Sequence, residues 1–232
     1  MTTPDNTSDT ATIMEIHRKL RDLYGDPPHR PDGEPVAALV NTILSQNTND
    51  RNRDIAFAAL REQFPTWEAV RDAPTDAVID AIRPAGLAPT KGPNIQVALQ
   101  RITEERGELS LDFLETLPLE EARQWLINLN GVGPKTAAIV LLFALGRPAF
   151  PVDTHVHRVT RRLGLIPQNT SREKAHTLLE ALVPPELYWT LHLNLITHGR
   201  QICHARQPDC AECPLQAQCA YYQESQEGGT SP

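Results

Sequence analysis

The apolar positions of the chain recur every three or four residues, which is the spacing of amphipathic α-helices. Two such stripes are formed by Ile13, Ile16, Leu20 and Leu23, and by Ile95, Leu99 and Ile102. Glycine and proline interrupt the pattern at short intervals, and no segment alternates strictly as a half-buried strand does. We therefore predict an all-α protein of short helices joined by brief loops.

Several helix ends can be predicted from capping residues. Thr66 and Thr75 each follow a proline and precede an acidic first turn, and Ser171 opens a similar run, so all three are expected to be N-caps. A helix break is expected over Gly86–Pro93. The polar tails, residues 1–11 and 223–232, are expected to be disordered.

The bulk composition is that of a globular chain of 232 residues, with 40% hydrophobic and 22% charged residues. The longest apolar run, Ala137–Leu145, is far shorter than the ~20 residues that span a bilayer. The first residues also lack the basic-then-apolar order of a signal peptide. We expect a cytoplasmic protein without a membrane partner, associated with the nucleoid if its source is prokaryotic.

The charge of the chain is unevenly distributed. The net charge is −7, which counts against general polyanion binding. Residues 151–206, however, hold seven Arg or Lys against four acids, so this segment carries +3 and the remainder −10. Because exposed charges are screened beyond about 8–10 Å, a local basic face can still meet phosphates. A solvated surface of mixed charge is the alternative.

All four cysteines fall in one short segment near the C-terminus, Cys203, Cys210, Cys213 and Cys219. Their spacing, C-x6-C-x2-C-x5-C, indicates one metal centre, because disulfides are rare in a chain of intracellular type. Structural zinc sites usually pair two short C-x2–4-C knuckles, and only Cys210 and Cys213 have that form. The two longer spacings favour a [4Fe–4S] cluster, with zinc as the alternative.

The segment LINLNGVGPKTAAIVLLFALG, residues 126–146, predicts a helix, a tight hairpin and a second helix. Gly131 and Gly133 permit positive φ and close backbone approach, and Pro134 suits the first position of a helix. The free N–H groups of such a loop suit an anion such as a DNA phosphate. An ordinary turn between helices is the alternative.

Two residues in or after this hairpin have side chains that are suited to covalent catalysis, in which the enzyme forms a bond to its substrate. Lys135 lies in the first turn of the second helix, and a neutral lysine is a nucleophile that forms Schiff bases. Asp153, in the next loop, would supply a carboxylate to manage protons. We expect Asp153 also to cap the helix from Thr154 to Leu163, which would hold its carboxylate in place.

Three motifs occur together in order: LNGVGPKTA, then PVDTHVHRV, then the cysteine cluster. In this combination the chain resembles the endonuclease III family of DNA glycosylases, within the helix–hairpin–helix superfamily. The resemblance implies two helical domains that flank a DNA-binding cleft. Residues 28–147 would form a helical barrel with the hairpin, and residues 12–27 would join 148–222 in a [4Fe–4S] domain.

The resemblance also implies roles for individual residues. Lys135 and Asp153 match the catalytic lysine and aspartate of the family, and the four cysteines match the ligands of a cluster that is mainly structural and helps to position DNA. Residues implied to contact DNA are Gly131, Val132 and Gly133 in the hairpin, Gln46 or Asn47 in the loop ILSQNTND, Leu87, His155 and Arg206. In this family Gln46 or Asn47, together with Leu87, would fill the gap left by a flipped base. For His155 a structural role is the alternative.

The activity implied is removal of oxidised pyrimidines from damaged double-stranded DNA, followed by β-elimination through a lysine Schiff base. Related adenine-mismatch glycosylases lack this lysine, so Lys135 favours a bifunctional glycosylase and AP lyase. The altered ILSQNTND loop leaves a mismatch thymine or uracil glycosylase open, and a non-catalytic DNA-binding iron–sulfur module is a third possibility. The family suggests a monomer.

Overall fold

The fold was obtained as a computed structural model, which describes residues 6–28 and 34–227. Every regular element in these ranges is helical, which confirms the prediction of an all-α protein. The chain divides into two compact units. We call residues 31–147 the central unit, and residues 1–30 together with 148–232 the terminal unit.

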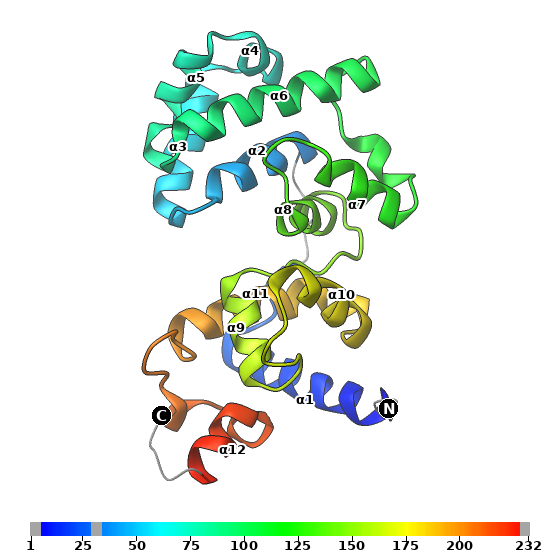
Figure 1. The fold of residues 1–232 in the computed structure, drawn as a ribbon, viewed down its shortest axis with the longest axis vertical. Coiled ribbons are helices and arrows are strands. Elements are labelled where there is room, and N and C mark those ends of the chain that lie inside the picture. The colour runs from blue at the N-terminus through cyan, green and yellow to red at the C-terminus, as the bar shows by residue number, and fades with distance from the viewer. Residues whose placement is uncertain (1–5, 29–33, 228–232) are drawn as a thin grey trace. The chain divides into compact units, whose positions relative to one another are not determined.

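The central unit holds the middle of the chain, drawn from light blue to green in Figure 1. Its α-helices are α2 (Pro35–Ser45), α3 (Asp50–Gln63), α4 (Trp67–Asp72), α5 (Thr75–Ala81), α6 (Ala88–Arg106), α7 (Leu119–Ile127) and α8 (Pro134–Ile139). Short 3-10 turns, η1 (Arg83–Ala85) and η2 (Asp112–Glu115), lie between them, and a π-helical turn, η3 (Val140–Ala144), continues α8.

Helix α2 is the core of the central unit. It packs against α3, α6, α8 and η3. Leu39, Val40, Ile43 and Leu44 are all at most 1% exposed, in keeping with the largely apolar sequence of this helix. The end of α2 therefore lies inside the unit, and the loop that follows it starts from a rigid support.

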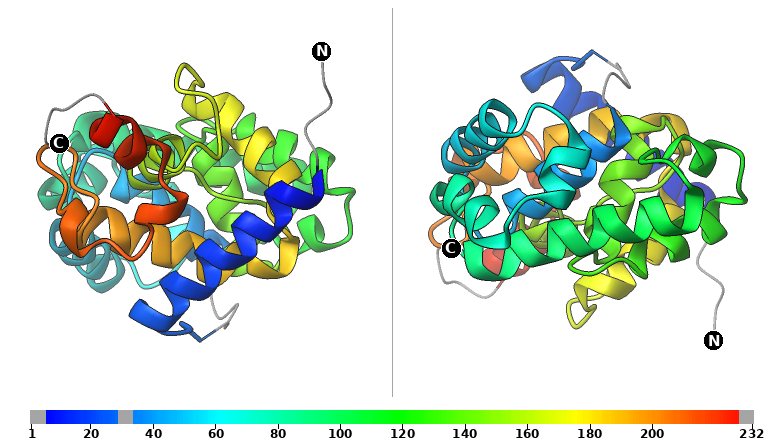
Figure 2. Two further views of the ribbon diagram at one scale, coloured as in Figure 1. Left: turned by 90° about the horizontal axis from the view of Figure 1, so that it is seen from below. Right: turned by 90° about the horizontal axis from the view of Figure 1, so that it is seen from above.

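The terminal unit joins the first helix of the chain to its last third. Its α-helices are α1 (Asn6–Tyr24), α9 (Thr154–Arg162), α10 (Arg172–Leu182), α11 (Tyr188–Gln201) and α12 (Ala220–Glu227). Three 3-10 turns, η4 (Pro185–Leu187), η5 (Cys210–Glu212) and η6 (Gln216–Gln218), complete it. Helix α11 packs against α9 and α1, and α1 also contacts α10 (Figure 2). The apolar stripe of α1 is buried at Ile13, Ile16 and Leu20, whereas Leu23 is half exposed.

The capping predictions are confirmed at two of three positions. The Thr66 and Ser171 hydroxyls accept hydrogen bonds from Ala69 N and Lys174 N at the starts of α4 and α10. Thr75, however, is the first residue of α5, and Pro74 is the N-cap. A proline can serve there because the N-cap position has extended backbone, and because no N–H is needed at this position, so the missing N–H of proline costs no hydrogen bond.

Two further expectations need correction. The break expected over Gly86–Pro93 ends at Leu87, because α6 begins at Ala88 and contains Pro93. Gly92 does not break the helix but lets α5 pack closely against α6, because a Cβ at Gly92 would lie 2.9 Å from Ile79 Cγ1. Residues 6–11 and 223–227, expected to be disordered, are helical, since backbone hydrogen bonds can extend a helix beyond its buried turns. Residues 1–5 and 228–232 lie outside the described residues.

Among the helices in the described part of the chain, none combines the length and the apolar character needed to cross a membrane.

Candidate functional site

The hairpin between α7 and α8 is a tight turn built around one glycine with positive φ. Leu129 N donates to Leu126 O, and Val132 N donates to Leu129 O, so the chain turns directly after α7. Gly131 has φ = 76° in the left-handed region, and a Cβ there would lie 2.9 Å from Asn94 Nδ2. Val132 is buried at 6% exposure and anchors the loop. Only glycine fits position 131 without strain.

The second glycine of the hairpin has a different role from the one expected. Gly133 has φ = −103° and is the extended N-cap of α8. A Cβ at Gly133 would meet nothing within 4 Å. Both glycines permit positive φ, but only Gly131 adopts it. Pro134 is the first residue of α8, as predicted.

Lys135 is the second residue of α8 and is half-buried. Its backbone is fixed by the hairpin before it and by the buried run Thr136, Ala137 and Ala138 after it. The fixed backbone sets the position of the Lys135 Cα and Cβ atoms, and the long side chain extends from that fixed point. The central unit therefore presents an amine next to the hairpin's backbone.

Two loops of the central unit carry the candidate gap-filling residues. Gln46 Nε2 donates to Gly131 O at 2.8 Å and lies 3.5 Å from Thr136 Oγ1, so Gln46 joins the end of α2 to the hairpin. Asn47 is exposed, with φ = 51°. Leu87 is 55% exposed, also with φ = 51°. The structure thus separates the two neighbours Gln46 and Asn47: one is tied inward and the other faces solvent.

Asp153 belongs to the terminal unit and caps α9, as predicted. Its Oδ1 accepts a hydrogen bond from Val156 N at 2.8 Å. The backbone just before it is held by side chains of two other helices: His176 Nδ1 lies 2.9 Å from Phe150 O, and His192 Nδ1 lies 2.9 Å from Pro151 O. Since a carbonyl can only accept, each Nδ1 carries a proton and donates. The aspartate therefore stands on a loop that is fixed from several sides.

His155 lies on the buried seam between α9 and α11. Its Nδ1 accepts from Arg158 Nη2 at 3.1 Å, because an arginine nitrogen can only donate. Arg158 also donates to Gly199 O and Cys203 O. A Cβ at Gly199 would lie 2.9 Å from His155 Cβ, so the two helices meet closely here. These contacts give His155 a structural function; its contact with DNA stays a prediction.

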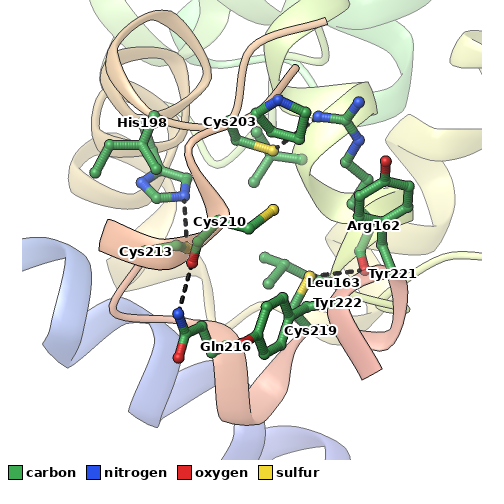
Figure 3. Close-up of a pocket in the computed structure, with 13 residues that line it drawn as sticks. Arg162, Leu163, His198, Cys203, Cys210, Cys213, Gln216, Cys219, Tyr221 and Tyr222 are labelled. Carbon is green, nitrogen blue, oxygen red and sulfur yellow. Dashed lines mark hydrogen bonds between the residues drawn. The ribbon is translucent and has the colours of Figure 1, made fainter. Parts of the chain in front are cut away.

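The four cysteines line one cavity of the terminal unit (Figure 3). The space between its lining atoms is about 380 Å³, part of it open to solvent. Within the described residues, no group of three or more His, Cys, Asp or Glu side chains is arranged to hold a single metal ion. Four cysteine sulfurs that line one cavity are a donor set for a zinc ion or for an iron–sulfur cluster.

Burial in this cavity raises the pKa values of three cysteine thiols. Burial raises the pKa of Cys213 to about 11 and also raises the pKa values of Cys210 and Cys219. Thiolates are the metal-binding form, so a bound cation must offset this cost. Near Cys213, His198 Nε2 lies 3.5 Å from Sγ, and Tyr24 OH lies 3.0 Å from His198 Nδ1. Burial lowers the pKa of His198 to about 4, so this ring is neutral.

Arg162 connects α9 to the cysteine loop. Its Nη1 donates to Cys203 Sγ at 3.2 Å and to His204 O at 2.6 Å, and its Nη2 donates to Ala205 O. Arg206, the next residue of that loop, is exposed. Sequence reasoning counted Arg158 and Arg162 only as part of a basic face. Arg158 and Arg162 are four residues apart, which places both on one side of a helix. This shared side is the feature of the sequence that indicates a common partner.

With this geometry established, comparison with known proteins is informative. A sequence model described as "HhH-GPD superfamily base excision DNA repair protein" matches residues 40–185. The chain belongs to the HhH-GPD superfamily. Endonuclease III of Thermotoga maritima is 33% identical over 216 residues, which span 93% of this chain and 96% of that protein. This match confirms the resemblance to the endonuclease III family within the superfamily.

Two further matches extend the comparison. An Arabidopsis thaliana relative is 43% identical over 165 residues, which cover 71% of this chain but 56% of the plant protein, so the match spans little more than half of that relative. A solved structure of a trapped endonuclease III–DNA covalent intermediate superposes with a TM-score of 0.79 at 28% identity, covering 97% of this chain and all of that one. The HhH-GPD fold is thus matched along almost the whole sequence.

Proposed function

We propose that this HhH-GPD protein is a base excision DNA glycosylase with AP lyase activity, which removes oxidised pyrimidines from double-stranded DNA. The observation that carries the proposal is Lys135, which lies in the first turn of α8 directly after the glycine hairpin. A binding module needs no nucleophile at that position. The likeness to a trapped endonuclease III–DNA covalent intermediate supports a reaction through a protein–DNA bond.

The covalent step follows from the chemistry of a lysine amine. A damaged nucleotide is first extruded from the stack, at a cost of a few kcal/mol that the damage itself reduces. Lys135 Nζ then attacks C1′, the C1′–N bond breaks, and the base leaves with the electron pair and takes up a proton. Opening of the sugar ring gives a C1′=Nζ Schiff base. Loss of a C2′ proton then breaks the C3′–O bond, which nicks the strand 3′ to the lesion.

Asp153 is proposed as the carboxylate of this reaction. A negative charge opposes the positive charge that develops on the sugar as the base leaves, and it can accept a proton from the lysine. The bond from Val156 N and the histidine bonds to the preceding loop hold this carboxylate before substrate arrives. Such preorganisation is what electrostatic catalysis requires, because no reorganisation is then needed at the moment of reaction.

The hairpin and its neighbouring loops are proposed as the DNA contacts of the central unit. The backbone of Gly131, Val132 and Gly133 suits a phosphate, which fixes register without reading sequence. Asn47 and Leu87 would fill the gap left by the extruded base, because both are exposed. Gln46 is better explained as the tie between this loop and the hairpin, since its amide already donates to Gly131 O.

The terminal unit is proposed as the cluster domain, and the central unit as the barrel domain. Cys203, Cys210, Cys213 and Cys219 would hold a [4Fe–4S] cluster, and their shared cavity and the two long spacings between them support this proposal. When bound, the cluster supplies structural cross-linking of the loop that carries Arg206. Arg162 and His198 are oriented towards Cys203 and Cys213. A visible absorption band in the purified protein would separate iron–sulfur from zinc.

A panel of labelled duplexes tests the proposed activity. Thymine glycol opposite adenine, uracil opposite guanine, thymine opposite guanine and a preformed abasic site would each be incubated with the full chain. We expect base release and strand nicking on thymine glycol, and nicking of the abasic site. Release of only uracil or mismatched thymine would support a mismatch glycosylase. Binding without base release or nicking on any duplex would contradict an enzymatic function.

A further inference from the structure

The central unit contains a buried lysine that the proposed chemistry does not use. Lys91 lies in the first turn of α6 and is only 2% exposed. Burial lowers the pKa of this ammonium group, because a charge is poorly solvated away from water. Lysine is almost never buried without partners, so the contacts of Lys91 identify what the position is for.

The partners of Lys91 are two backbone carbonyls from distant parts of the chain. Its Nζ donates to Leu44 O and to Ala85 O, both at 2.8 Å. Leu44 lies in the last turn of α2, and Ala85 ends the 3-10 turn η1. A single ammonium group therefore bridges the ends of two elements that the sequence separates by about forty residues.

Each of these elements leads directly into an exposed residue with unfavourable backbone geometry. Asn47 follows Leu44 by three positions, and Leu87 follows Ala85 by two. Both have φ = 51°, a left-handed conformation that leucine rarely adopts and that asparagine tolerates better. Such a conformation persists only where the surrounding structure imposes it. The Lys91 bridge stands at the base of both loops and is in the right position to impose it.

We propose that Lys91 is a positioning residue that holds the loops of Asn47 and Leu87 at a fixed spacing, so that both side chains can enter the DNA stack together. This inference rests on the proposed function, in which these two residues fill the gap left by the extruded base. Both hydrogen bonds of Lys91 go to backbone carbonyls, and neither goes to Lys135. Loss of Lys91 should therefore impair extrusion of the nucleotide and leave the covalent chemistry intact.

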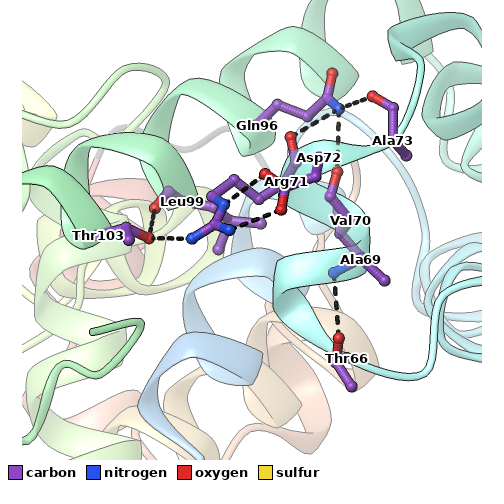
Figure 4. A network of polar contacts seen from close by, with 9 residues as sticks. All are labelled: Thr66, Ala69, Val70, Arg71, Asp72, Ala73, Gln96, Leu99 and Thr103. Carbon is purple, nitrogen blue, oxygen red and sulfur yellow. Dashed lines mark hydrogen bonds and ion pairs between the residues drawn. The ribbon is translucent and has the colours of Figure 1, made fainter. Parts of the chain in front are cut away.

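The same helix offers a matched control. Gln96 is five residues further along α6 and is 4% exposed. Its Nε2 donates to Val70 O at 3.0 Å and to Ala73 O at 2.8 Å, which lie in and after α4 (Figure 4). A third, longer contact joins Gln96 Nε2 to Arg71 O at 3.4 Å. Like Lys91, Gln96 therefore binds main-chain carbonyls through one buried nitrogen, but its carbonyls belong to a part of the unit that carries no gap-filling residue. Methionine at either position removes the donors and keeps a similar apolar length.

The test compares Lys91→Met, Gln96→Met and the wild type on a duplex with 2-aminopurine opposite a tetrahydrofuran abasic analogue. Insertion of side chains into the stack unstacks 2-aminopurine and raises its fluorescence. We expect the wild type and Gln96→Met to raise fluorescence equally and Lys91→Met to give a much smaller rise. On thymine glycol, kcat for base release should fall about tenfold in Lys91→Met, which corresponds to ~1.4 kcal/mol in the barrier. Nicking of a preformed abasic site should fall much less.

Equal fluorescence and equal base release in folded Lys91→Met and Gln96→Met would overturn the inference. If Lys91→Met does not fold, Lys91→Leu, which also has no donor for the two carbonyls, takes its place, and a wild-type fluorescence rise in that variant would also overturn the inference. A wild type that neither raises fluorescence nor releases a base would instead contradict the proposed function, so the two failures are distinguishable.

Discussion

At the scale of single residues, identical or chemically similar residues that lie close together in the sequence have different physical roles. Gly131 and Gly133 are two positions apart, yet only Gly131 has positive φ and a neighbour that a Cβ would strike. Gln46 and Asn47 are adjacent, yet only Gln46 is bonded to the hairpin. The motif predicted that these positions matter, but it could not separate their roles, because those depend on contacts made by Asn94 and Gly131 from other segments.

The glycine pair gives a prediction on stability. Gly131→Ala should lower the free energy of unfolding by about 1–3 kcal/mol, because alanine is strained at this backbone conformation. Gly133→Ala should change it by less than about 1 kcal/mol, since loss of the glycine N-cap and loss of unfolded-state entropy oppose each other. Urea unfolding of both variants measures the difference. Equal destabilisation by the two substitutions would show that the hairpin is described wrongly.

The glutamine–asparagine pair gives a prediction on catalysis. Asn47→Ala should slow base release from thymine glycol about tenfold, since a gap left unfilled removes about 1–2 kcal/mol of support for the extruded state. Its melting temperature should fall only slightly, because Asn47 is exposed and the one cost is that alanine tolerates φ = 51° less well than asparagine does. Gln46→Ala is the paired variant, which should weaken DNA binding by loosening the hairpin. A larger loss of kcat in Gln46→Ala than in Asn47→Ala would reverse the assignment.

At the scale of elements, most helix positions follow from sequence, and the exceptions have identifiable causes. Thr66, Ser171 and Asp153 cap helices as their patterns indicate. The start of α6 differs from the sequence-based prediction because Gly92 and Pro93 form a pattern that is typical of a helix break. Gly92 instead allows α5 to approach α6 at Ile79, and this is a tertiary contact that no local pattern encodes. Lys91 was overlooked for the same reason, since its partners Leu44 and Ala85 lie on other elements.

Asp153 has a capping role in stability and a proposed role in catalysis, and substitutions at this position can distinguish the two. Asp153→Asn should keep stability within about 0.5 kcal/mol, because asparagine caps as well as aspartate does, whereas Asp153→Ala should lose ~1 kcal/mol. Both variants should lose about 10²–10⁴-fold in base release, since neither retains the carboxylate. Thermal unfolding and single-turnover kinetics measure the two effects. Wild-type activity in Asp153→Asn would restrict this residue to its capping role.

At the scale of the whole molecule, the chain folds as two compact units, and one of them joins the first helix to the last third of the sequence. Apolar spacing predicted the helices of both units but carries no information on which helices share a unit. The cysteine segment differs from the rest, because η5 and η6 have three residues each and so few backbone hydrogen bonds of their own. In the proposed function, a bound metal centre would supply the cross-links that regular structure does not.

Removal of the metal should therefore loosen only the terminal unit. After chelation of the metal or in Cys203→Ser, amide hydrogen exchange should rise over residues 203–222 and in the adjoining ends of α9 and α11. Exchange in residues 34–147 should not change, because the four cysteines all belong to the terminal unit. Unchanged exchange over 203–222, or an equal rise in the central unit, would contradict the assignment.

The central claim is that Lys135 forms the covalent bond to DNA, and borohydride trapping tests it most directly. Borohydride reduces a Schiff base to a stable amine, so wild-type protein mixed with a thymine glycol duplex should give a covalent adduct of protein and DNA. Lys135→Ala, folded and loaded with metal to the same extent, should give none. An adduct of undiminished yield in Lys135→Ala, or base release by the wild type with no adduct, would contradict the claim.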